Sequence, residues 1–193
     1  MKYSKLKTMK TVKLLALLFV ANLAFVSCSS DDDGHDDHDH DHEEELITTV
    51  IYTLYHGNDI VTLTFQDLDG PGGADGTYDV SGPLAANTTY SGTTALLNET
   101  ENPAEDITEE VEHEGDEHEF FYVSSLDDIT ISKLDQDEDG NPVGIETSLT
   151  TGDAGTGSLT IILKHEPNKP NNGTPDDAGG STDVEVTFPI TVQ

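Results

Sequence analysis

Residues 184–192 read VEVTFPITV, with an apolar side chain at every second position. A period of two is the pattern of a β-strand that buries one face and exposes the other. Pro189 has no backbone N–H to donate to a neighbouring strand, so it places this strand at the edge of a sheet. Val61, Leu63 and Phe65 repeat the same alternation earlier in the chain.

Short β-branched runs of this kind, separated by Gly, Pro, Asn and Asp, cover the chain from Leu46 onward. The predicted strands are residues 46–55, 60–65, 78–80, 88–97, 119–124, 129–134, 144–150, 158–164 and 184–192. Strands at this spacing, without long helices between them, predict an all-β fold, an antiparallel immunoglobulin-like β-sandwich over residues 46–193. One helix is expected between Asn102-Pro103 and Gly115, and residues 166–182 are expected to form a long surface loop.

Residues 1–27 have the composition of a secretory signal peptide. A basic segment, residues 1–13, precedes an apolar run from Leu14 to Val26 that is too short to span a bilayer. The run ends in Phe25-Val26-Ser27-Cys28, which resembles a bacterial lipobox, so residues 1–27 are interpreted as a lipoprotein signal peptide and Cys28 as the lipidated residue. An ordinary cleaved signal peptide that leaves Cys28 as a free thiol is the alternative.

The sequence after the cysteine, Ser29 to Asp33, resembles the acidic export signals of surface-exposed lipoproteins. The expected location is therefore the outer membrane, where a lipid anchor would hold the protein with its body in the periplasm or on the cell surface.

Residues 31–45 read DDDGHDDHDHDHEEE and contain no apolar side chain. A segment of this composition cannot bury a core, so residues 28–45 are interpreted as the lipidated cysteine and a disordered tether. Its four imidazoles, with carboxylates around them, are ligands that zinc accepts. The predicted zinc ligands of the tether are His35, His38, His40 and His42. A solvated spacer without bound metal is the alternative.

The net charge of the chain, −31, argues against nucleic acid as a partner. The sequence also has no G-x-S-x-G, phosphate-loop or dinucleotide-binding motif, and its single cysteine is the expected lipidation site. We therefore expect a protein that is not an enzyme.

A second group of possible zinc ligands surrounds the sequence HEGDEH at residues 113–118. The two histidines are five residues apart, whereas a helical zinc-protease motif needs four, so a metalloprotease is excluded. Glu110, His113 and His118 could still meet at the end of a helix and hold a metal. A solvated acidic turn is the alternative.

Residues 135–146 match the calcium-loop pattern D-x-D-x-D-G-x5-E. The predicted calcium ligands are Asp135, Asp137, Asp139, Asn141 and Glu146. The flanking residues are expected to be strands and not the helices of an EF-hand, and a plain hairpin turn is the alternative.

Several segments together resemble a group of small lipoproteins of flavobacterial type. They are the lipobox and acid-His leader, residues 96–99, 103–110, 117–122, 139–144 and 164–167, and the closing residues 183–188. Members of this group are often assigned to the type 1 periplasmic-binding-fold superfamily, which implies a two-domain α/β sugar-binding fold. That fold needs more residues and alternating strands and helices, and the sequence has neither.

The resulting hypothesis is a non-enzymatic outer-membrane lipoprotein that captures a divalent metal, most plausibly zinc, and passes it to a neighbouring uptake receptor of the TonB-dependent type. The alternative is a calcium-stabilised sandwich that binds a surface polymer or a protein partner.

Overall fold

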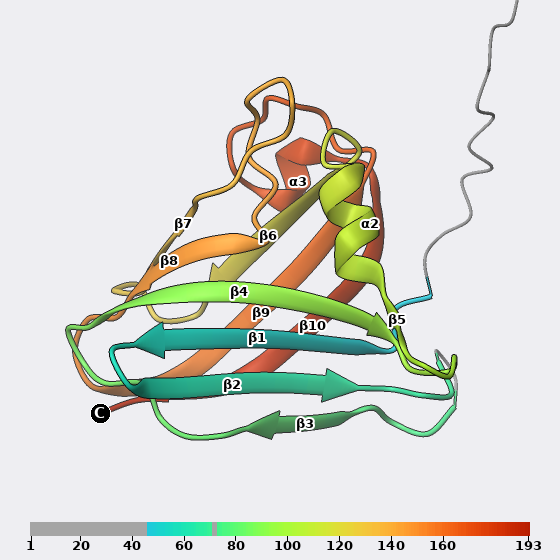
Figure 1. Ribbon diagram of the computed structural model, residues 1–193. Helices are drawn as coiled ribbons and strands as arrows, with labels where there is room; N and C mark the ends of the chain where they lie inside the picture. The colour runs from blue at the N-terminus through green and yellow to red at the C-terminus, as the bar shows by residue number, and fades with distance from the viewer. Residues whose placement is uncertain (1–45, 71–72) are drawn as a thin grey trace, which may run out of the picture. The chain divides into compact units, whose positions relative to one another are not determined.

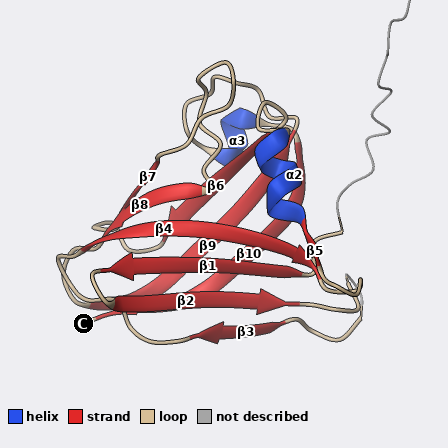
Figure 2. Cartoon of the chain, in the orientation of Figure 1, coloured by secondary structure: helices blue, strands red, loops and turns tan. Residues whose placement is uncertain are grey.

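Two antiparallel sheets pack face to face in the computed structural model, which describes residues 46–70 and 73–193 (Figures 1 and 2). The larger sheet contains β1 (Thr49–His56), β2 (Asp59–Gln66), β3 (Thr77–Val80), β4 (Thr89–Asn98), β5 (Glu105–Asp106), β7 (Thr130–Lys133) and β8 (Glu146–Thr150). The smaller sheet contains β6 (His118–Ser124), β9 (Gly155–His165) and β10 (Ser181–Val192). The described residues also form two short helices, α2 (Ile107–His113) and α3 (Pro175–Ala178).

The strand order is β3-β2-β1-β4-β8-β7 in the larger sheet, with β5 paired to β4, and β10-β9-β6 in the smaller one. Apolar side chains of both sheets meet in one core, including Leu54 and Leu96 from the larger and Ile161 and Phe188 from the smaller. The predicted antiparallel β-sandwich is therefore confirmed.

The alternation in the last strand is confirmed as well. The side chains at Val186, Phe188, Ile190 and Val192 are buried, and the residues between them are exposed. Strand β10 lies at the edge of its sheet, as Pro189 predicts.

The predicted start of the helix at Asn102-Pro103 is wrong. Glu105 and Asp106 pair with β4 and stay extended, so α2 begins only at Ile107. The carboxylate of Asp106 accepts a hydrogen bond from the Thr108 N–H and caps the helix. Pairing of Glu105 and Asp106 with β4 therefore delays the start of the helix.

The segment expected to be a surface loop, residues 166–182, is partly structured. It contains α3, and Ala178 of that helix packs against Phe121 and Ile162 in a second, small apolar cluster. Phe121 and Ile162 lie on the face of the smaller sheet opposite the main core, since side chains alternate along a strand. The segment therefore covers part of that outer face.

The signal peptide, Cys28 and the tether histidines His35, His38, His40 and His42 lie outside the described residues, and these predictions stay predictions. Within residues 46–70 and 73–193, neither helix has the length and apolarity that crossing a bilayer requires.

Candidate metal centre

The three strands of the smaller sheet bring two histidines and one aspartate together at one end of the sheet. His118 is the first residue of β6 and lies in register with His165, the last residue of β9. Asp183 belongs to β10, which pairs with β9 from the other side. Each ligand candidate therefore comes from a different strand.

A β-bulge explains why Asp183 can join the histidines. The register of β10 against β9 shifts between Thr182 and Val184, so Asp183 is an extra residue in its strand. Val184 packs against the core, and strict alternation would direct its neighbour Asp183 to the other face. A bulge changes the direction of a side chain locally, and here it turns Asp183 toward the face that carries His118 and His165.

The distances suit a metal ion. Nε2 of His118 lies 3.8 Å from Oδ2 of Asp183, and Nδ1 of His165 lies 3.7 Å from Oδ1 of the same carboxylate. One ligand atom from each of the three residues lies within 4.8 Å of the other two. Zinc bonds of 2.0–2.2 Å place tetrahedral ligand atoms about 3.3 Å apart. The two His–Asp separations would therefore shorten by about 0.4 to 0.5 Å on binding, and any pair at the 4.8 Å limit by up to about 1.5 Å.

All three side chains are buried. The exposed fraction is 0% for His118, 8% for His165 and 1% for Asp183. The two imidazole rings lie against each other, with their centroids 4.7 Å apart. Burial of two imidazoles and a carboxylate at one point is costly unless they are paired with one another or with a cation.

The turn after α2 fixes the orientation of His118. Nδ1 of His118 lies 3.1 Å from the carbonyl oxygen of Glu114, which can only accept, so Nδ1 carries the proton of this hydrogen bond. In the neutral ring the lone pair is then on Nε2, the nitrogen that faces Asp183. A metal-binding histidine is held in this way in known zinc sites, where the second ring nitrogen donates to a carbonyl or carboxylate.

The same turn places Glu117 beside His165. Oε2 of Glu117 lies 3.9 Å from Nε2 of His165, and the Glu117 side chain is 38% exposed. The backbone of Glu117 is fixed at both ends, because its N–H donates to Glu114 and its carbonyl accepts from Glu166.

Of the second predicted zinc set, only His118 belongs to the cluster. Glu110 and His113 lie exposed on α2 and are not part of it. Sequence reasoning missed His165 and Asp183. No local motif contains them, since only sheet pairing brings His165 beside His118 and only the bulge turns Asp183 inward.

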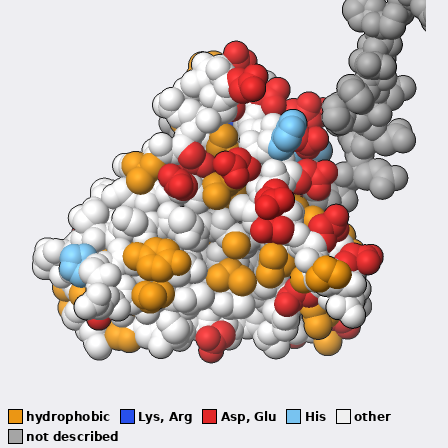
Figure 3. Space-filling view, viewed as in Figure 1, with side chains coloured by type: hydrophobic (Ala, Val, Ile, Leu, Met, Phe, Trp, Pro, Cys, Tyr) orange, Lys and Arg blue, Asp and Glu red, His pale blue; other side chains and the backbone are white. Residues whose placement is uncertain are grey.

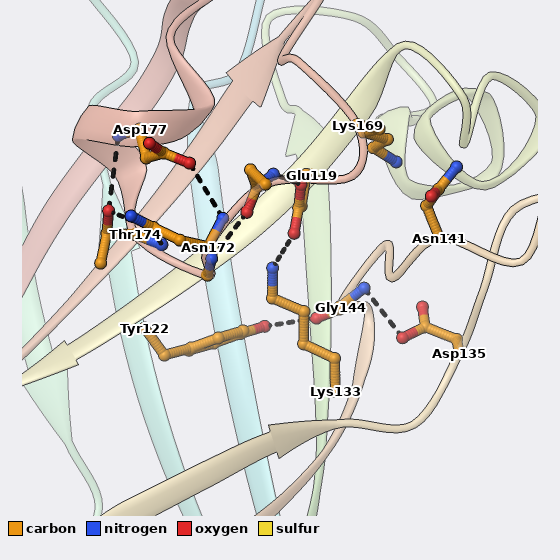
Figure 4. A network of polar contacts seen from close by, with 12 residues as sticks. Glu119, Tyr122, Lys133, Asp135, Asn141, Gly144, Lys169, Asn172, Thr174 and Asp177 are labelled. Atoms are coloured by element: carbon orange, nitrogen blue, oxygen red, sulfur yellow. Dashed lines mark hydrogen bonds and ion pairs between the residues drawn. The ribbon is translucent and has the colours of Figure 1, made fainter.

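In the loop with the calcium-binding pattern, backbone N–H groups of the loop itself already donate hydrogen bonds to a carboxylate. The Asp135 carboxylate accepts hydrogen bonds from the N–H groups of Gly144 and Ile145, each at 2.8 Å, and Figure 4 shows the first of these. Asp139 and Glu146 are exposed. Among the described residues, the His118, His165 and Asp183 group alone gathers three or more His, Cys, Asp or Glu ligand atoms within 4.8 Å. The calcium site at residues 135–146 stays a prediction.

Asp137 in this loop is held by a buried ammonium group. Nζ of Lys169, whose side chain is 5% exposed, lies 3.3 Å from Oδ2 of Asp137 and also donates to the carbonyl of Gly115. Burial alone would raise the pKa of Asp137, but hydrogen bonds from Asn141 and from Lys169 outweigh it and lower the pKa below 3.8.

A second polar network lies on the outer face of the smaller sheet (Figure 4). The Glu119 carboxylate pairs with Lys133 and accepts a hydrogen bond from Asn171 at 2.7 Å. Burial lowers the pKa of Lys133, although Glu119 acts in the opposite direction. Because Glu119 follows His118 directly in β6, alternation separates this network from the histidine cluster.

Comparison of the chain with protein-family models, curated proteins and solved structures found no significant match. The resemblance to flavobacterial lipoproteins therefore stays a prediction.

Proposed function

We propose that this protein binds a divalent transition metal, zinc by preference, through His118, His165 and Asp183. The observation that carries the proposal is the convergence of three ligand atoms within 4.8 Å, one from each strand of the smaller sheet. The turn at Glu114 supports it, because it holds the His118 ring in the tautomer that directs a lone pair toward Asp183.

The ligand types favour zinc over the alkaline-earth ions. Imidazole nitrogen and carboxylate oxygen suit zinc, whereas calcium and magnesium prefer sites built entirely from oxygen. Calcium also needs six to eight oxygen ligands, and this cluster offers one carboxylate and two imidazoles.

The burial of the cluster favours storage or transfer of the ion over catalysis. Catalytic zinc keeps a coordination position open to water and substrate. His118, His165 and Asp183 are at most 8% exposed, which leaves a substrate little access to an ion between them.

The acidic surface around the cluster would raise the local concentration of cations. Acidic side chains gather over α2 and the turn that follows it (Figure 3). Those in the sequence there are Glu109, Glu110, Glu112, Glu114, Asp116 and Glu117. A divalent ion close to this surface is attracted toward the end of the sheet where the ligands lie.

The wider proposal is a non-enzymatic lipoprotein of the outer membrane, anchored through Cys28. Its tether histidines would gather zinc loosely, and the buried cluster would hold one ion for transfer to an uptake receptor. The tether offers many interchangeable ligand sets, whereas the cluster has fixed geometry, so we expect the cluster to bind zinc more tightly.

Isothermal titration of the full chain with zinc tests this function. To separate the two regions, the titration is repeated with His35, His38, His40 and His42 each changed to Asn. We expect one zinc ion per chain to remain bound in this tether variant, and to be lost when His118→Asn or His165→Asn is added. Changing His113, which is exposed on α2, to Asn is the matched control and should leave that ion bound. Absence of zinc binding in the tether variant would refute the proposed site.

A further inference from the structure

The turn from Glu114 to Glu117 contacts both histidines of the candidate centre. The N–H of Glu117 donates to the carbonyl of Glu114 at 2.9 Å, which closes the turn. The same carbonyl accepts from Nδ1 of His118, and the Glu117 carboxylate faces Nε2 of His165. One short segment therefore reaches the outer ring nitrogen of each histidine.

Each imidazole has one nitrogen toward Asp183 and the other toward this turn. His165 directs Nδ1 to Asp183, at 3.7 Å, and Nε2 to Glu117, at 3.9 Å. An ion held between His118, His165 and Asp183 would bind the Nδ1 side of His165. The proton of a neutral ring would then be on Nε2, and the Glu117 carboxylate could accept a hydrogen bond from that N–H.

We infer that Glu117 is a positioning residue of the metal centre, which orients His165 by accepting a hydrogen bond from Nε2. This inference rests on the proposed function of the cluster. A carboxylate behind a metal-binding histidine is a recurring arrangement, and removal of such a partner lowers metal affinity by about 10- to 100-fold.

The side chain of Glu117 can move closer to His165, whereas its backbone cannot. A hydrogen bond requires a separation near 2.9 Å, so the carboxylate has to move about 1 Å closer than its present 3.9 Å from His165. The backbone of Glu117 is fixed by Glu114 and Glu166, whereas its side chain is 38% exposed and can change rotamer.

The inference also separates the roles of two acids that are neighbours in sequence. Glu114 acts through its backbone carbonyl, so its side chain is not needed for the contact to His118. Glu117 acts through its side chain. Replacing the side chain of Glu117 should therefore change the zinc affinity of the cluster, whereas replacing that of Glu114 leaves the contact to His118 in place.

The test measures the zinc affinity of the full chain with the four tether histidines changed to Asn, by competition with a chromophoric chelator. We expect Glu117→Ala to weaken binding by about 10- to 100-fold. Glu117→Gln should weaken it less, because the amide oxygen still accepts a hydrogen bond but has no charge. Asp59→Asn removes an exposed acid at the start of β2, outside the acidic surface over α2, and should leave the affinity unchanged.

Cobalt absorption distinguishes a positioning residue from a ligand. Since Glu117 does not coordinate the ion in this account, the visible Co²⁺ bands of Glu117→Ala should keep the position and intensity of the parent protein. Altered bands would mean that Glu117 is a ligand and would overturn the inference. Unchanged zinc affinity in Glu117→Ala would overturn it as well, while loss of zinc in His118→Asn would still support the proposed function. If the parent protein binds no zinc, both fail together.

Discussion

Oδ2 of Asp183 lies 3.8 Å from Nε2 of His118, although their strands, β10 and β6, do not pair with each other. Strand β9 lies between them and contributes His165 at the centre. Neighbouring strands are about 4.8 Å apart, so the backbones of β10 and β6 are separated by about 9 to 10 Å. The two side chains meet only because both turn inward over β9, and this convergence creates a site for a small ion.

Zinc should stabilise the folded protein. An ion that binds the folded state alone adds about 2.7 kcal/mol to the free energy of unfolding at a free concentration 100 times its Kd. The cluster exists only when the three strands are paired, whereas any zinc bound by the proposed tether histidines would not depend on folding. Thermal unfolding with zinc and with a chelator should therefore differ in the wild type and agree in His118→Asn. A zinc-induced rise in Tm that persists in His118→Asn would contradict this site.

Removal of the Lys169 ammonium group should destabilise the protein strongly. Lys169 is 5% exposed and pairs with Asp137, whose side chain is 1% exposed. Lys169→Met leaves this carboxylate buried without its cation, a change that costs about 3 to 5 kcal/mol. Urea unfolding at pH 7 measures the loss. Lys164→Met is the control, since Nζ of Lys164 donates to the Thr182 hydroxyl in an exposed contact. A change above about 1 kcal/mol in this control would mean that loss of any lysine has this effect.

Asp137 should contribute to acid unfolding. Its pKa lies below 3.8 in the folded protein, so its carboxylate stabilises the fold above that pH, and this stabilisation is lost as pH falls through the lowered pKa. In Asp137→Asn, the free energy of unfolding should depend less on pH below about 4 than in the wild type. Denaturant unfolding between pH 2.5 and 6 compares the two, and parallel curves would contradict the role of Asp137.

The β-sandwich could be predicted from the sequence because the pattern that indicates each strand lies within that strand. Alternation at residues such as Val186 and Phe188 reports directly which face of a strand is buried. The metal centre could not be predicted, because its geometry depends on the register between strands that are far apart in the sequence and on the β-bulge at Asp183. His118 meets His165 through strand pairing, and Asp183 departs from the alternation that identified its own strand. The HEGDEH segment did indicate the region, although only its last residue is a candidate ligand and its acids lie in the supporting turn.

The buried phenol of Tyr52 should make the protein sensitive to alkali. Its hydroxyl lies 2.8 Å from that of Thr147 in the core between the sheets. Burial raises the pKa of Tyr52 to about 12, against 10.0 for an exposed phenol, although the hydrogen bond with Thr147 acts in the opposite direction. Because the folded pKa is raised, the stabilisation is fully present below pH 10 and is lost as pH rises from 10 toward 12.

A shift of this size corresponds to about 2 to 3 kcal/mol over that pH range. In Tyr52→Phe, this part of the stability lost at alkaline pH should no longer be lost. The part due to Tyr122 should remain, since burial also raises the pKa of that phenol. At pH 8 the variant should lose about 1 to 3 kcal/mol, because the buried Thr147 hydroxyl loses its hydrogen bond with Tyr52. Urea unfolding at pH 8, 10 and 11 measures both effects. Tyr55→Phe is the matched control, because Tyr55 is 43% exposed and its phenol already contacts water. If Tyr52→Phe and Tyr55→Phe lost stability equally between pH 10 and 11, ionisation of the core phenol would not be the cause of alkaline unfolding.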